Sequence, residues 1–91
     1  MYRLGFHRIF YQSPHVNQQE LTAIFLTHLL ETKGPFALTY ISDGLYYLDV
    51  TFRRLGSHVF SIYSGADCEA KKILVVEPGE LSIIYPREAI L

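Results

Sequence analysis

The sequence is poor in the residues that hold many small secreted or metal-bound proteins together. Its 91 residues contain one cysteine, Cys68, which has no partner for an internal disulfide and no neighbouring thiols for a structural metal site. The net charge of −1 provides no positive field of the kind that attracts nucleic acid or anionic lipid. We therefore expect a cytoplasmic protein without metal or other cofactor, for which nucleic acid is a less favoured partner.

Long apolar runs are also lacking. No run approaches the roughly 18 residues of a membrane-spanning helix, and the first residues lack the pattern of a secretory signal. We expect a complete, untagged product with no membrane partner. The chain has no repeat, low-complexity tract or linker, and 49% of its residues are hydrophobic, which is enough for a core. We therefore predict that residues 1–91 form a single compact domain.

An amphipathic pattern in the first third of the chain predicts a helix. Residues 2–12 come first, where the alternation of Tyr2, Leu4 and Phe6 predicts a strand with one buried face, bulged near Gly5. Ser13-Pro14 breaks this strand, and Asn17 with Glu20 three residues later fits a capping box that opens a helix. A helix from about Asn17 to Lys33 is then predicted by an apolar stripe at helical spacing, formed by Leu21, Ile24, Phe25, His28 and Leu29.

The rest of the chain reads as strands and turns. Strands are predicted over residues 35–42, 45–55 and 58–64, and the first two are joined by Ser42-Asp43-Gly44, which is typical of a tight hairpin. Residues 65–72 fit either a loop or one helical turn. Residues 73–76 and 81–85 predict a closing hairpin. The expected fold is α+β: a mostly antiparallel sheet of five or six strands with one helix on one face, in the order β-α-β-β-β-β-β.

Patterns that indicate catalysis or metal binding are weak. The four histidines, at 7, 15, 28 and 58, include no pair spaced to share one side of a helix. Ser64 lacks the first glycine of a nucleophile elbow, and the six glycines are scattered singly at turns. We therefore predict no catalytic, cofactor-binding or metal-binding residues and expect that the protein is not an enzyme.

Two resemblances supply alternative functions. Asp49 followed by Glu69-Ala70-Lys71 resembles the acidic and lysine residues of restriction-endonuclease-like nucleases, which implies metal-dependent phosphodiester hydrolysis. That family places its acid-x-lysine step on a strand, whereas residues 65–68 here predict a turn, so whether Asp49, Glu69 and Lys71 form a site stays open. Residues 58–63 resemble the aromatic strand of RNA-recognition motifs, but without its basic-glycine-aromatic opening. A nucleic-acid-binding domain is thus the first alternative and a small metal-dependent nuclease the second.

The favoured function is protein binding. Seven tyrosines exceed what a small core requires, and tyrosine is common in protein interfaces, although it is also a good strand residue. In the strand predicted over residues 45–55, one face carries Tyr47, Asp49, Thr51 and Arg53. A single helix cannot cover both faces of a sheet, so we expect this face to be exposed. We predict a non-enzymatic protein-protein interaction module, such as a small inhibitor or adaptor encoded by a phage or mobile element. Its partner is another protein or a second copy of this chain, and a homodimer is one form this could take.

Overall fold

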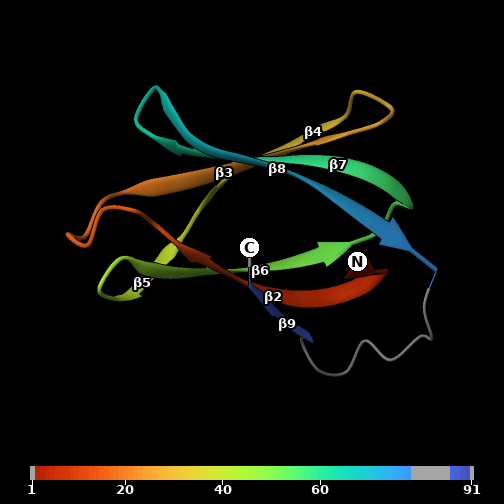
Figure 1. Ribbon diagram of the computed structural model, residues 1–91. Helices are drawn as coiled ribbons and strands as arrows, with labels where there is room; N and C mark the ends of the chain where they lie inside the picture. Colours follow the sequence, from red (N-terminus) through yellow and green to blue (C-terminus); the bar gives the residue numbers. More distant parts are fainter. Residues whose placement is uncertain (1, 79–86, 91) are drawn as a thin grey trace.

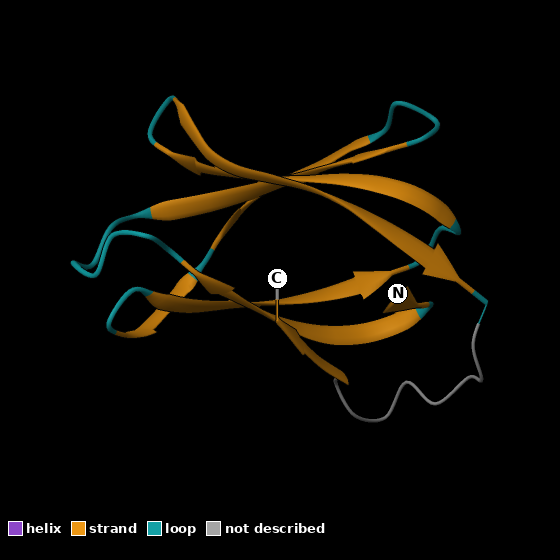
Figure 2. Cartoon of the chain, in the orientation of Figure 1, coloured by secondary structure: helices purple, strands orange, loops and turns teal. Residues whose placement is uncertain are grey.

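The protein is built from strands that form two sheets. The computed structural model describes residues 2–78 and 87–90, and no helix occurs within them (Figure 2). The strands are β1 (Tyr2–Arg3), β2 (Gly5–Gln12), β3 (Leu21–Thr27), β4 (Thr32–Ala37), β5 (Thr39–Ser42), β6 (Leu45–Phe52), β7 (Gly56–Ser64), β8 (Asp67–Glu77) and β9 (Arg87–Ile90). Sheet A has the order β1-β8-β7-β3-β4 and sheet B the order β5-β6-β2-β9 (Figure 1). The predicted α+β fold is therefore wrong, and the structure is an all-β sandwich.

The segment predicted as a helix contains strand β3. Phe25 faces the core at 4% exposure, whereas its neighbour Ile24 lies on the outer face and is half-buried. Leu29, which the helix would have buried, is 56% exposed. Nearly every position from Leu21 to Leu26 is apolar, so the segment satisfies both the helical and the strand period. Antiparallel pairing with β7 along the whole of β3 selects the strand.

The predicted first strand is divided between the two sheets. β1 pairs with β8 in sheet A, and the chain then enters sheet B as β2. Gly5 makes this passage possible, because its φ of 117° is strained for any residue with a side chain. The break reverses the expected alternation: His7, Ile9 and Tyr11 face the core, while Phe6 lies on the outside.

The region predicted as one strand over residues 35–42 also changes sheets. β4 pairs with β3 in sheet A, whereas β5 pairs with β6 in sheet B, and the chain crosses at Leu38. The predicted hairpin between β5 and β6 is confirmed. Asp43 and Gly44 both have positive φ, at 51° and 80°, as the favoured two-residue hairpin turn requires.

The undecided segment, residues 65–72, is mostly strand. A turn at Gly65 and Ala66 leads into β8, which pairs with β7 through a register shift near Tyr63. Residues 73–76 lie within β8, but the predicted strand over residues 81–85 lies outside the described residues. β9 follows and pairs in parallel with β2.

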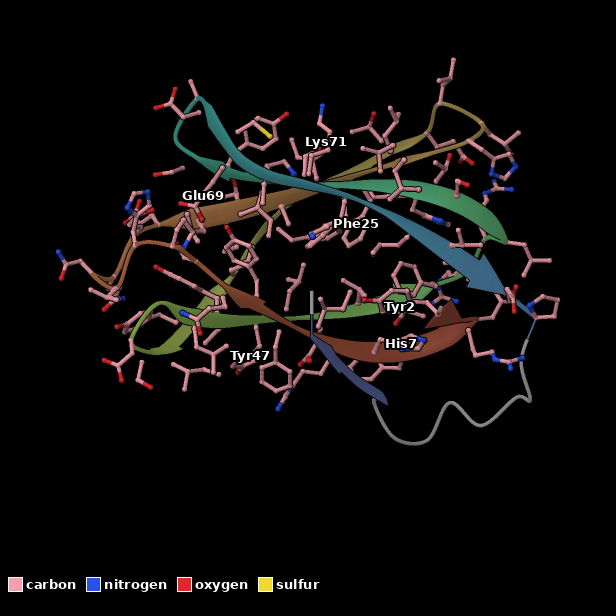
Figure 3. All side chains as sticks on the ribbon, in the orientation of Figure 1. Tyr2, His7, Phe25, Tyr47, Glu69 and Lys71 are labelled. Carbon is pink, nitrogen blue, oxygen red and sulfur yellow. The ribbon has the colours of Figure 1, made fainter. Side chains whose placement is uncertain are left out.

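Aromatic rings fill much of the space between the sheets. Phe25 of β3 stacks on Phe60 of β7 with ring centroids 4.6 Å apart. It also meets Phe52 of β6 edge-on at 5.9 Å, so this contact joins sheet A to sheet B. Figure 3 shows Phe25 in the space between the two sheets. The sequence-based placement of Phe25 in the core is confirmed, although the element that carries it is a strand.

Candidate protein-binding site on strand β6

The two faces of β6 are divided as the sequence predicts. Tyr46, Leu48, Val50 and Phe52 point into the core and are buried. Tyr47, Asp49 and Thr51 point to the outside of sheet B, and Arg53 follows directly after the strand and is exposed. Figure 3 shows Tyr47 on the side of sheet B that faces away from sheet A. We call Tyr47, Asp49, Thr51 and Arg53 the β6 strip.

Arg8 of β2 fixes the geometry of the β6 strip. Its guanidinium donates two hydrogen bonds to the Asp49 carboxylate, from Nε at 2.8 Å and from Nη2 at 3.0 Å. The same group lies 4.4 Å from the centre of the Tyr47 ring. The hydrogen bond from Arg8 holds the pKa of Asp49 below its ordinary value. Tyr47 and Asp49 are therefore held in set orientations by a contact within the protein.

Sequence reasoning did not place Arg8 in this site. Arg8 and Asp49 are 41 positions apart and meet because β2 and β6 pair in a register that places them opposite each other. A single sequence contains no local signal for that register.

The second half of β6 has an open edge. β5 pairs only with the part of β6 from Leu45 to Tyr47, and within the described residues no strand lies beside residues 48–52 on that side. Figure 1 shows β6 extending well past β5. Alternate residues of an antiparallel strand direct their N–H and C=O groups to opposite sides. Part of the backbone of residues 48–52 is therefore available to an added strand.

A hollow of about 520 Å³ lies next to this open edge, between the margins of the two sheets. Its apolar wall comes from Phe25 of β3, Phe36 of β4, and Val50 and Phe52 of β6. We call it the β4–β6 hollow. It exists because the chain leaves sheet A for sheet B at Leu38, so that β5 covers one end of β6 and leaves the other uncovered.

The mouth of the β4–β6 hollow is positively charged. Lys33, Arg53, Arg54 and Asp49 are its charged lining residues. Asp49 is paired with Arg8, and Arg54 is paired with Glu31 at 2.7 Å. Within the part of the chain that the structure describes, neither Lys33 nor Arg53 forms an ion pair. Among the described residues, the hollow therefore presents two cations without an ion pair beside an apolar wall.

The other candidate residues do not assemble into a catalytic site. Asp49 lies on the outer face of sheet B, whereas Glu69 and Lys71 belong to β8 in sheet A (Figure 3). Glu69 accepts a hydrogen bond from the Tyr11 hydroxyl. Across residues 2–78 and 87–90, no three His, Cys, Asp or Glu side chains are grouped as metal ligands would be. The arrangement that resembles the nuclease family is thus not brought together.

Two of the four histidines are core residues. His7 and His58 are 3% and 4% exposed. The Nε2 of His7 lies 2.6 Å from the Arg3 carbonyl oxygen, and the Nδ1 of His58 lies 3.1 Å from that of Gly56. Because a carbonyl oxygen only accepts, each of these ring nitrogens donates. Burial with a satisfied donor is a structural role.

Comparison with known proteins found no matching family model, no matching curated protein and no matching solved structure. The described residues include no apolar helix of membrane-spanning length.

Proposed function

We propose that this protein is a non-enzymatic protein-recognition module that binds its partner along β6. The observation that carries the proposal is the open backbone edge of residues 48–52 lying directly beside the apolar β4–β6 hollow. An unpaired strand edge is a template for another chain, and an adjoining apolar hollow provides a place for an anchoring side chain. The β6 strip adds an ordered aromatic ring and charged groups at the same place.

The other strand edges support the choice of β6. On β4, Pro35 lacks the N–H that a neighbouring strand would need. On β8, the exposed residues Lys71 and Lys72 occupy the part of the strand that β1 does not cover. Proline and lysine are the usual means of blocking edge pairing. Residues 48–52 carry neither, so this edge is left open where two others are protected.

Nucleic-acid binding has weaker support. Arg8, whose guanidinium lies 4.4 Å from the centre of the half-buried Tyr47 ring, is already paired with Asp49. The net charge of −1 adds no general attraction for a phosphate backbone. We favour a protein partner for the same surface and propose that the protein is a cytoplasmic inhibitor or adaptor. The exposed free thiol of Cys68 fits a reducing compartment such as the cytoplasm.

The test is affinity capture combined with analytical ultracentrifugation, comparing the wild-type chain with the paired variant Tyr47→Ala, Arg53→Ala. The matched control is Lys71→Ala, Lys72→Ala, which alters two exposed residues on β8. We expect a stoichiometric protein partner, or self-association, that the control retains and the β6 variant weakens at least about tenfold. Equal binding by a folded β6 variant would move the site elsewhere.

A further inference from the structure

We propose that the partner contributes an extended segment, alternating apolar and acidic residues, that joins sheet B as an added strand beside residues 48–52. This inference rests on the proposed function and specifies the chemistry of the partner. The main chain of the added segment would bond to the open edge, and its inward side chains would enter the β4–β6 hollow. This is strand addition, in which the backbone supplies affinity and alternate side chains supply specificity.

The position for such a strand is defined by β5. β5 runs antiparallel to β6 and pairs with it up to the position of Tyr47, where the chain departs toward sheet A through Leu38. An added segment would continue the line of β5 along residues 48–52. At about 3.3 Å per residue, a segment of about six residues covers that edge.

Alternation follows from the two sides of the open edge. Side chains directed inward would meet Phe25, Phe36 and Phe52, which requires apolar groups. Side chains directed outward would lie on the surface of sheet B beside Thr51, Arg53 and Asp49, whose carboxylate is already paired with Arg8. A strand that places apolar and polar residues on opposite faces has this period of two.

The positive charges of Lys33 and Arg53 favour acidic residues at the polar positions of the added strand. Lys33 pairs across the sheet with Phe25, so it lies on the face of β4 that overhangs the hollow. Arg53 lies at the same mouth, and neither forms an ion pair among the described residues. Outward carboxylates on the added strand would lie on the face of sheet B that carries Arg53, and one at the rim of the hollow would also be attracted to Lys33, because charges there are less screened than on an open surface.

A second copy of this chain fits the open edge less well. Its own open edge, residues 48–52, has no side chain to place in the β4–β6 hollow, because Leu48, Val50 and Phe52 are buried in its own core. The long uncovered edge of its sheet A belongs to β8, which carries Lys71 and Lys72. Placing these lysines beside Lys33 and Arg53 brings like charges together, which is unfavourable in a pairing edge. Charge complementarity therefore points to a different protein with an acidic segment.

The experiment uses the full chain labelled with ¹⁵N and a blocked peptide of about six residues that alternates valine or phenylalanine with glutamate. We expect amide shifts at residues 48–53 and at Phe25 and Phe36. A peptide N-methylated on the edge-facing amides should bind at least about tenfold more weakly, because the added strand then lacks donors. A peptide with lysine in place of glutamate should not bind.

A charge swap completes the test. The double variant Lys33→Glu, Arg53→Glu should bind the glutamate peptide about tenfold more weakly than wild type and should bind the lysine peptide. The control variant Lys71→Glu, Lys72→Glu should bind the glutamate peptide as wild type does. Absence of shifts at up to about 1 mM peptide, equal binding of the N-methylated peptide, or the same shifts with decanoate would each overturn strand addition. If the peptide fails while capture still depends on Tyr47 and Arg53, the proposed function stands and this inference falls.

Discussion

The hydroxyl of Tyr11 donates a hydrogen bond of 2.6 Å to the Oε2 of Glu69 and so connects the two sheets. Tyr11 lies on the inner face of β2 in sheet B and is 7% exposed. Glu69 lies at the point in β8 where the register with β7 shifts, because Ile62 pairs with Ala70 and Tyr63 pairs with Cys68. Glu69 therefore has no opposite residue on β7, and a bulged residue of this kind is left out of the regular strand pairing. It can therefore meet a hydroxyl from the opposite sheet.

Tyr11→Phe should destabilise the protein by about 1.5 kcal/mol or more, because a hydrogen bond to a charged group is lost and the Glu69 carboxylate keeps its partial burial. Chemical denaturation followed by tyrosine fluorescence or circular dichroism measures the change. Tyr63→Phe is the control, since Tyr63 is half-buried on β7 and its hydroxyl makes no hydrogen bond to a described residue. Equal effects of the two substitutions would mean that the bond between the sheets contributes nothing.

The hydrogen bond between Tyr11 and Glu69 should make the free energy of unfolding depend on pH in the alkaline range. Burial raises the pKa of the Tyr11 hydroxyl, and the hydrogen bond to Glu69 raises that pKa further. Its stabilisation is therefore fully present below the unfolded-state pKa of about 10 and is lost as pH rises through the folded-state pKa. The difference in unfolding free energy between wild type and Tyr11→Phe should shrink above pH about 10. A constant difference up to the onset of alkaline unfolding would contradict this assignment.

Two alanine substitutions distinguish the observed strand β3 from the helix that the sequence pattern predicts for the same segment. Phe25→Ala should cost about 3–5 kcal/mol, because a buried aromatic ring leaves a cavity next to Phe60 and Phe52. Leu29→Ala should change stability by less than about 0.5 kcal/mol, since Leu29 is 56% exposed. A helix would bury both residues. Comparable losses for the two variants, measured by urea denaturation, would therefore favour the helix.

The ion pair between Arg8 and Asp49 should stabilise the protein modestly at neutral pH, and this stabilisation should be lost in acid. A double-mutant cycle with Arg8→Gln and Asp49→Asn should give a coupling of about 0.5–1 kcal/mol at pH 7, because the contact is two-pronged but one-third exposed. The folded-state pKa of Asp49 is lowered, so this coupling is present above about pH 4 and is lost as pH falls through the folded-state value. Coupling that persists when the carboxyl is protonated would show that the charge is not its source.

Alanine substitutions at two glycines with positive φ distinguish the cost of backbone strain from the cost of a steric clash. Gly44 has a φ of +80°, and a Cβ there would lie 2.8 Å from the His15 carbonyl oxygen. Gly65 has a φ of +60° with nothing within 4 Å of that position. Gly65→Ala should cost about 1 kcal/mol from strain alone, and Gly44→Ala should cost clearly more. Equal melting temperatures for the two variants would mean that the loop at His15 moves aside freely.

Some features of this protein were determined by short stretches of sequence. The hairpin at Asp43-Gly44 follows from residues that accept positive φ, and the two faces of β6 follow from its alternating residues. Phe25 was correctly placed in the core because it is apolar under both the helical and the strand period. Each of these depends on neighbours within a few positions, and such local preferences are visible in one sequence.

The tertiary structure decided the rest. Leu21–Thr27 is a strand because β7 and β4 pair along it, and no local signal distinguished this outcome from a helix. Arg8 meets Asp49 across 41 positions and Tyr11 meets Glu69 across 58, so both contacts depend on strand register and sheet packing. The open edge of β6 and its hollow exist because the chain crosses between sheets at Leu38. Sheet membership is a long-range property: it is fixed by which strands find each other, whereas turn type and face alternation are fixed by the residues themselves.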